Sequence, residues 1–112
     1  MSNTDHGTMV RIPITRPGAA GRARIVASGL GGIDDFAFTG RRDTLIAALD
    51  QPNMVALVHP NGTRTIVLTA KDGLQSPSAI AARGCTVYVT NAAYNTGKDP
   101  NLLTARLTGG TR

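Results

Sequence analysis

The sequence repeats with a period of 44 to 45 residues, and this period constrains the fold more than any other feature. Asp, Met and Val recur at an offset of 45 between residues 5–12 (DHGTMVRI) and 50–57 (DQPNMVAL). Gly-Leu recurs at an offset of 44 between residues 29–30 and 73–74. The matches occur in the same order along the chain. Such self-similarity is typical of folds that stack one supersecondary unit several times.

Short strands separated by tight turns fill each repeat, and no segment has a convincing helical pattern. The turn at residues 60–62 (Pro-Asn-Gly) is the clearest, because Asn-Gly tolerates the positive φ of a tight hairpin. We expect first strands at 34–39 and 78–83, second strands at 44–50 and 86–91, third strands at 8–15, 54–59 and 101–108, and fourth strands at 22–28 and 64–69. The chain is therefore predicted to be all-β.

Four strands per repeat at this period is typical of a β-propeller blade. We expect one partial propeller domain over residues 1–112, with a half blade at 8–28, a full blade at 34–69 and a three-stranded incomplete blade at 78–108. The inner strands carry continuous apolar runs, as strands buried on both faces do. About two and a half blades are too few to close a ring within one chain.

Residues 29–38 (GLGGIDDFAF) resemble the start of the inner strand in SMP-30/gluconolactonase-like six-bladed propellers. In that family the common form is Gly, then Pro-Asp-Gly, then alternating apolar residues. Residues 73–81 look like the next blade of the same group, and residues 86–91 match its second-strand ending. These are blade motifs, which NHL and strictosidine-synthase-like propellers share. The resemblance implies that the chain corresponds to roughly the C-terminal third of a six-bladed propeller.

The resemblance implies a lactonase-like or related small-molecule hydrolase that acts through a metal-activated water. Metal-dependent members hold a divalent cation in the central channel through oxygen ligands, which suit calcium. Asp34 matches the Asp of the Pro-Asp-Gly motif and is the candidate ligand. Ile33 and Asp35 replace Pro and Gly, and Ser78 occupies the equivalent position in the next blade, so we expect an incomplete metal site. Alternatively, Asp34 and Asp35 cap a turn.

Several polar residues follow predicted second strands. Asp5 and Asp50 occupy the same repeat position, which favours a structural turn role, and the same interpretation applies to Asn3 and Asn91. Residues 94–100 are an insertion relative to the preceding blade, and loops at a propeller rim commonly meet ligands. The candidates for lining a small-molecule site there are Tyr94, Asn95 and Lys98. A surface loop without a ligand is the alternative.

Charge and composition narrow the possible partners. The formal net charge is +5, and ten of the twelve cationic residues are Arg. No basic helix is predicted and the aromatic residues do not interleave with Arg, so we expect no nucleic-acid partner. No apolar run approaches a membrane span. Residues 1–8 are polar and lack the core of a signal peptide, so we expect a cytoplasmic protein unless the chain was cut from a longer precursor. Cys85, the only cysteine, is expected to be a small buried residue.

The incomplete ring leaves three interpretations open: a fragment of a longer chain, a short protein that builds its ring from several copies, or a truncated relic. A stable natural chain is expected to self-associate, with three copies as the best guess. Three chains supply about 27 strands against 24 in a six-bladed ring, with 8–15 and 101–108 competing for one place and 22–28 completing the neighbour's last blade. The alternative to a hydrolase is a non-catalytic scaffold or binding module, or a degenerate fragment that oligomerises.

Overall fold

The computed structural model describes residues 1–41, 43–93 and 100–107. These residues form an all-β structure, as predicted, and their only helix is a single 3-10 turn at Ala70–Asp72. The strands are β1 (Ser2–Asn3), β2 (Thr8–Arg11), β3 (Ile14–Arg16), β4 (Ala19–Ala20), β5 (Arg24–Ala27), β6 (Ile33–Arg41), β7 (Thr44–Leu49), β8 (Met54–Val58), β9 (Arg64–Leu68), β10 (Pro77–Arg83), β11 (Thr86–Asn91) and β12 (Asn101–Arg106). No helix in the described part of the chain is long and apolar enough to cross a membrane.

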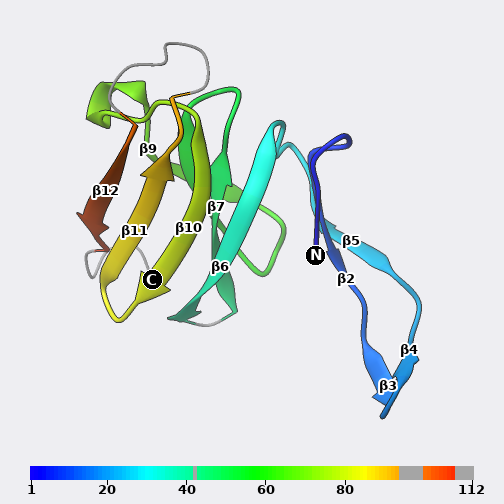
Figure 1. Cartoon of the computed structure of the whole chain (residues 1–112). Helices are drawn as coiled ribbons and strands as arrows, with labels where there is room; N and C mark the ends of the chain where they lie inside the picture. The colour runs from blue at the N-terminus through cyan, green and yellow to red at the C-terminus, as the bar shows by residue number, and fades with distance from the viewer. Residues whose placement is uncertain (42, 94–99, 108–112) are drawn as a thin grey trace.

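The strands form antiparallel sheets whose order follows the repeat. A four-stranded sheet with the order β6-β7-β8-β9 lies between a three-stranded sheet β1-β2-β5 and a three-stranded sheet β10-β11-β12 (Figure 1). We name these the central, N-terminal and C-terminal sheets. Their strands occupy the predicted first, second, third and fourth positions of successive repeats. None of the sheets of the described residues closes on itself.

The N-terminal hairpin departs from the expected strands. The predicted strand 8–15 divides into β2 and β3, and the return strand divides into β4 and β5, so that β3 and β4 form a separate small sheet that extends away from the rest (Figure 1). Pro13 lies at the break, where its missing N–H removes a ladder donor. Gly21 crosses it closely: the Gly21 amide donates to the Pro13 carbonyl at 2.6 Å, and a Cβ on Gly21 would lie 2.8 Å from the Pro13 ring.

The two middle strands of the central sheet, β7 and β8, are buried on both faces, which confirms the interpretation of the apolar run in β7. The other predicted inner strands differ from the expectation, since Phe38 on β6 is 73% exposed and Tyr88 on β11 is 37% exposed. Successive residues of β7 and β8 point to opposite faces, as in any strand. One face packs on the C-terminal sheet through Ile46, Ala48, Val55 and Leu57, and the other packs on the N-terminal sheet through Ala47, Leu49, Ala56 and Val58. All eight side chains are at most 3% exposed. Two apolar cores therefore hold three sheets in a stack.

The pairing register corrects the offset of 45. Asn3 pairs with Thr8, and Leu49 pairs with Met54, so each of these two hairpins has a four-residue loop. Thr8 is therefore the structural equivalent of Met54, at an offset of 46. The Asn3 carboxamide accepts from the His6 amide at 3.3 Å within its loop, which fits the structural role predicted for this residue.

The corrected offset also separates two aspartates that the sequence had placed together. Asp50 is the first residue of its loop, whereas Asp5 is the second residue of the other loop. The prediction that both occupy the same repeat position is wrong by one residue. A shared Met-Val pair is a weak guide here, because a one-residue slip changes the loop position and reverses the face to which a strand residue points.

Candidate functional site

The predicted metal ligand Asp34 lies near Asp50 at one end of the central sheet. Asp34 is an exposed residue at the start of β6, and Asp50 follows directly after β7, so the antiparallel pairing brings them together. Burial raises the pKa of Asp50, the negative charge of Asp34 raises this pKa further, and a hydrogen bond with the Ser76 side chain partly opposes the shift. Two carboxylates therefore repel each other here.

This pair supplies part of a cation site. Calcium takes about six to eight oxygen ligands, often carboxylates with carbonyls and waters. Within the described residues, no third His, Cys, Asp or Glu joins Asp34 and Asp50 in a group that could hold a metal. Two carboxylates are fewer oxygen donors than calcium takes, and the described residues add no third acidic or imidazole ligand to them, so we derive no reaction step through a metal.

Asp35 joins two sheets rather than capping its own turn. Its carboxylate accepts a hydrogen bond from the Ile80 amide at 2.9 Å, across 45 positions of sequence. Ile80 lies on β10, the edge strand of the C-terminal sheet, which presents unpaired backbone donors on its outer side. Asp35 satisfies one of these donors and links β6 to β10. The turn-capping hypothesis therefore does not describe this contact of Asp35.

Two asparagines organise the loops between the central and C-terminal sheets. The Asn53 carboxamide accepts from the Ser76 amide at 2.8 Å. Asn91, only 2% exposed, accepts from the Gln75 amide at 3.1 Å and donates to the Gly73 carbonyl at 3.2 Å. These two bonds reach 16 and 18 positions back along the chain, so Asn91 holds a distant loop, whereas the sequence had predicted a turn directly after its strand. Asn53 was missed, although Asn is one of the non-glycine residues that most readily adopt its left-handed φ of 55°.

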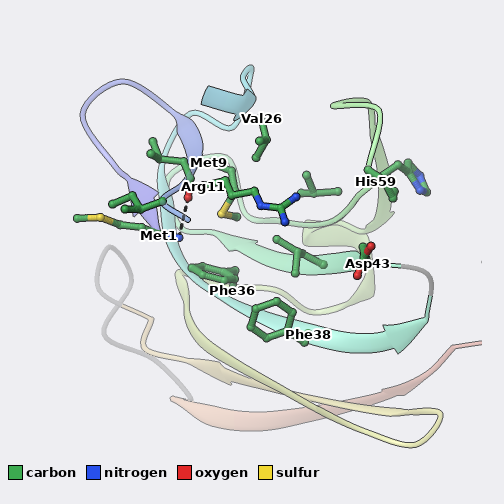
Figure 2. A pocket seen from close by; sticks show the side chains of 13 residues that line it. Met1, Met9, Arg11, Val26, Phe36, Phe38, Asp43 and His59 are labelled. Carbon is green, nitrogen blue, oxygen red and sulfur yellow. Dashed lines mark hydrogen bonds between the residues drawn. The ribbon is translucent and has the colours of Figure 1, made fainter. Parts of the chain in front are cut away.

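A pocket of about 420 Å³ lies between the N-terminal and central sheets, at the end of the central sheet that carries the β6–β7 and β8–β9 turns. Figure 2 shows Phe36 and Phe38 on one side of it and Arg11 pointing into it. Its lining residues are Met1, Met9, Val10, Arg11, Ile12, Val26, Phe36, Phe38, Asp43, Leu45, Val58, His59 and Pro60. Among the described residues that line it, the wall is mostly apolar, and the polar exceptions are Arg11, Asp43 and His59. No sequence pattern indicated this pocket, because its walls come from two different repeats.

The aromatic wall of this pocket is incompletely covered. Phe36 and Phe38 pack edge to face with ring centroids 6.1 Å apart. Phe38 is 73% exposed, a large value for an aromatic residue on a strand that packs against other sheets. The facing N-terminal sheet has only the two-residue strand β1 at this edge. The described residues therefore place no first strand opposite the two rings.

The remaining candidate residues are placed as follows. Tyr94, Asn95 and Lys98 lie outside the described residues. Cys85 is exposed, which corrects the expectation that it is buried, because it sits in the tight turn between β10 and β11 rather than on a strand. Its sulfur accepts a hydrogen bond from the Arg41 guanidinium at 2.9 Å.

No protein-family model matches the chain, and no curated protein matches its sequence significantly.

Proposed function

We propose that this chain supplies consecutive blades of a β-propeller and acts as a binding scaffold that becomes complete when copies associate into a ring. The proposed blades are the half blade at 8–28, the full blade at 34–69 and the three-stranded blade at 78–108. The order of the strands in the three sheets and their stacking in sequence order support this assignment. Three copies are the expected number, on the strand count of a six-bladed ring.

One observation carries the proposal: the outer face of the C-terminal sheet is exposed where its equivalent in the central sheet is buried. Pairing with the neighbouring strands makes Tyr88 the equivalent of Ile46, and Leu102 the equivalent of Val55. Ile46 and Val55 are 1% and 0% exposed, whereas Tyr88 and Leu102 are 37% and 59% exposed. A further sheet stacked on this face would continue the interface that the central sheet already makes.

The proposal is tested by light scattering coupled to size exclusion over a range of protein concentrations. We expect a discrete species at three times the 11.6 kDa chain mass. Tyr88→Asp should shift this species toward the monomer, because a charge would be buried in the contact. The matched control is Ala20→Asp on the separate β3–β4 sheet. A wild-type chain that stays monomeric at every concentration would contradict ring formation, and aggregate of no fixed size would favour the fragment interpretation.

A hydrolase is the second candidate, and the proximity of Asp34 to Asp50 is the observation that favours it. In a propeller, Asp34 would begin the strand nearest the central channel, so a ring of copies would gather one such carboxylate from each chain. Calcium titration by calorimetry tests this in the associated form. Stoichiometric binding that is lost in Asp34→Asn but kept in Asp5→Asn, together with turnover of simple lactones, would support a metal-dependent hydrolase. Binding that persists in Asp34→Asn would exclude Asp34 as a ligand.

A further inference from the structure

We propose that the pocket beside Phe36 and Phe38 receives the β10–β11 hairpin of a second copy of this chain, with the second copy's Arg83 paired to Asp43. The inference rests on the proposed ring and names the contact that closes it. The first strand of the docked hairpin, the second copy's β10, would stand where the N-terminal sheet has no first strand. Figure 2 shows Asp43 and the two phenyl rings around the pocket that the hairpin would fill.

The contact between the central and C-terminal sheets provides the template. There, the turn after β6 touches the turn after β10, because the Arg41 guanidinium donates to the Cys85 sulfur at 2.9 Å. Arg41 pairs with Thr44, and Arg83 pairs with Thr86 in the same way. Arg83 therefore occupies the position of Arg41 in the next repeat. If a second copy's C-terminal sheet stacks on the central sheet, its arginine reaches the turn after β6.

The residue that would receive this arginine carries the opposite charge. Asp43 precedes Thr44 just as Cys85 precedes Thr86, so Asp43 holds the place of the sulfur acceptor. Asp43 and Arg83 are both exposed in the single chain. An arginine–carboxylate pair, in which both partners carry charge, is also a stronger hydrogen-bonded contact than the arginine–sulfur contact of the template. The turn after β6, with Asp43, and the turn after the second copy's β10, with Arg83, therefore carry opposite charges at the position where Arg41 and Cys85 meet within one chain.

The apolar part of the contact follows the same template. Ile46 on the central sheet shares one core with Ile80 and Val87 of the C-terminal sheet. One repeat further, Tyr88 takes the place of Ile46. The equivalents of Ile80 and Val87 are then Phe36 and Leu45, which line the pocket. A second copy's Tyr88 would therefore pack on Phe36 and Leu45, aromatic against aromatic.

The pocket is also a continuation of an interface that already exists within the chain. Met9 and Val58 belong to the core between the N-terminal and central sheets and also line the pocket, and Val26, Phe36 and Leu45 pack against that core. A hairpin entering the pocket would extend this core without forming a separate patch. The occupant must offer one small apolar face and a cation at its turn, and the β10–β11 hairpin has both, in Ala81 with Tyr88 and in Arg83.

Docking of this hairpin displaces two strands. The two-residue β1 holds the second-strand place beside β2 that the second copy's β11 would take, because Asn3 pairs with Thr8 as Leu49 pairs with Met54. A strand in the third position must give way as well. The second copy's β12 and the receiving chain's β2 are both third strands and would occupy the same place. None of the six residues of β12 is buried, whereas β2 has two buried residues and the equivalent central strand β8 has four. Within the strands themselves, displacing β12 therefore exposes fewer fully buried side chains than displacing β2. We infer that β2 stays and completes the second copy's last sheet.

A charge-reversal cycle tests the contact in the full chain. Arg83→Glu and Asp43→Lys should each raise the dissociation constant of the associated species by roughly tenfold or more, and the double variant should recover most of that loss. Arg64→Glu, an exposed arginine on β9, is the matched control for net charge and should change little. Circular dichroism checks folding, and Asp43→Asn removes the charge while keeping a residue that tolerates its φ of 58°.

The outcomes separate this inference from the proposed ring. Recovery in the double variant, together with weaker association of Tyr88→Ser, supports the docked hairpin. Association by the wild type without recovery in the double variant overturns the inference and leaves the ring proposal standing. A wild type that never associates overturns both. If a longer chain carries a strand before residue 1 that fills the pocket, Arg83→Glu in that longer chain will leave its association unchanged. The second copy is then the wrong occupant.

Discussion

Replacing Asp35 should loosen the contact between the central and C-terminal sheets. Its carboxylate accepts from the Ile80 amide at 2.9 Å, in a partly buried position. A hydrogen bond to a charged group contributes about 1.5–3 kcal/mol when it is buried, and partial solvent access lowers this to about 1–2 kcal/mol. Asp35→Ala should therefore reduce the free energy of unfolding by about that amount. In a domain of this size the corresponding fall in Tm is roughly 4–10 °C.

The adjacent aspartate makes the experiment self-controlled. Asp34→Ala removes the same charge one residue away from an exposed position, and should leave the free energy of unfolding unchanged or slightly higher. Urea unfolding at one fixed protein concentration gives both values, and hydrogen exchange should show faster exchange of the Ile80 amide only in Asp35→Ala. Equal losses in the two variants, or unchanged exchange at Ile80, would refute the assignment of Asp35 as the link between sheets.

Three further outcomes follow from the loops and the core. Because the pKa of Asp50 is raised in the folded protein, the contribution of Asp50 to stability is greatest at a pH below its ordinary pKa of 3.8 and is lost as the pH rises through the raised pKa. Asp34→Asn removes the neighbouring charge, so thermal unfolding should show a stabilisation of ~0.3 kcal/mol at neutral pH and none near pH 3. Asn53→Ala should cost about 1–2 kcal/mol in urea unfolding, and Asn53→Gly less, because Gly restores the left-handed backbone but not the bond to Ser76. Leu57→Ala should cost about 2–5 kcal/mol by the same method, because the cavity would open in the core shared with the C-terminal sheet, and a loss under 1 kcal/mol would contradict burial there.

Sequence reasoning located the strands of the central and C-terminal sheets to within two residues, because apolar runs and glycine turns are local signals. β7 and β11 were expected at 44–50 and 86–91 and are Thr44–Leu49 and Thr86–Asn91. The break in the N-terminal hairpin at Pro13 was missed. Pro at that position was visible, but its effect depends on the close passage of Gly21, which is a tertiary contact.

The candidate site was only partly predictable for the same reason. Asp34 was singled out by its motif, but its interaction with Asp50 depends on strand pairing between β6 and β7. Asp35 was assigned to a local turn because Asp commonly caps turns, and the structure directs it to a strand 45 positions away. The pocket beside Phe36 had no sequence signature at all. Contacts between residues of different repeats depend on how the sheets stack, and the stacking of sheets cannot be derived from the residues of one repeat alone.

The corrected register of the N-terminal hairpin decides how copies of this chain can meet. At an offset of 45 Val10 would match Val55, which faces the C-terminal sheet, but the pairing places Val10 at the position of Ala56, which faces the N-terminal sheet. Val10 pairs with Ile25, which is 64% exposed, so the two lie on the outer face of the N-terminal sheet. The two ends of the stack therefore present opposite faces of the repeat. Copies that continue the stack must associate head to tail, which produces a closed ring if the rotation fits and a filament if it does not.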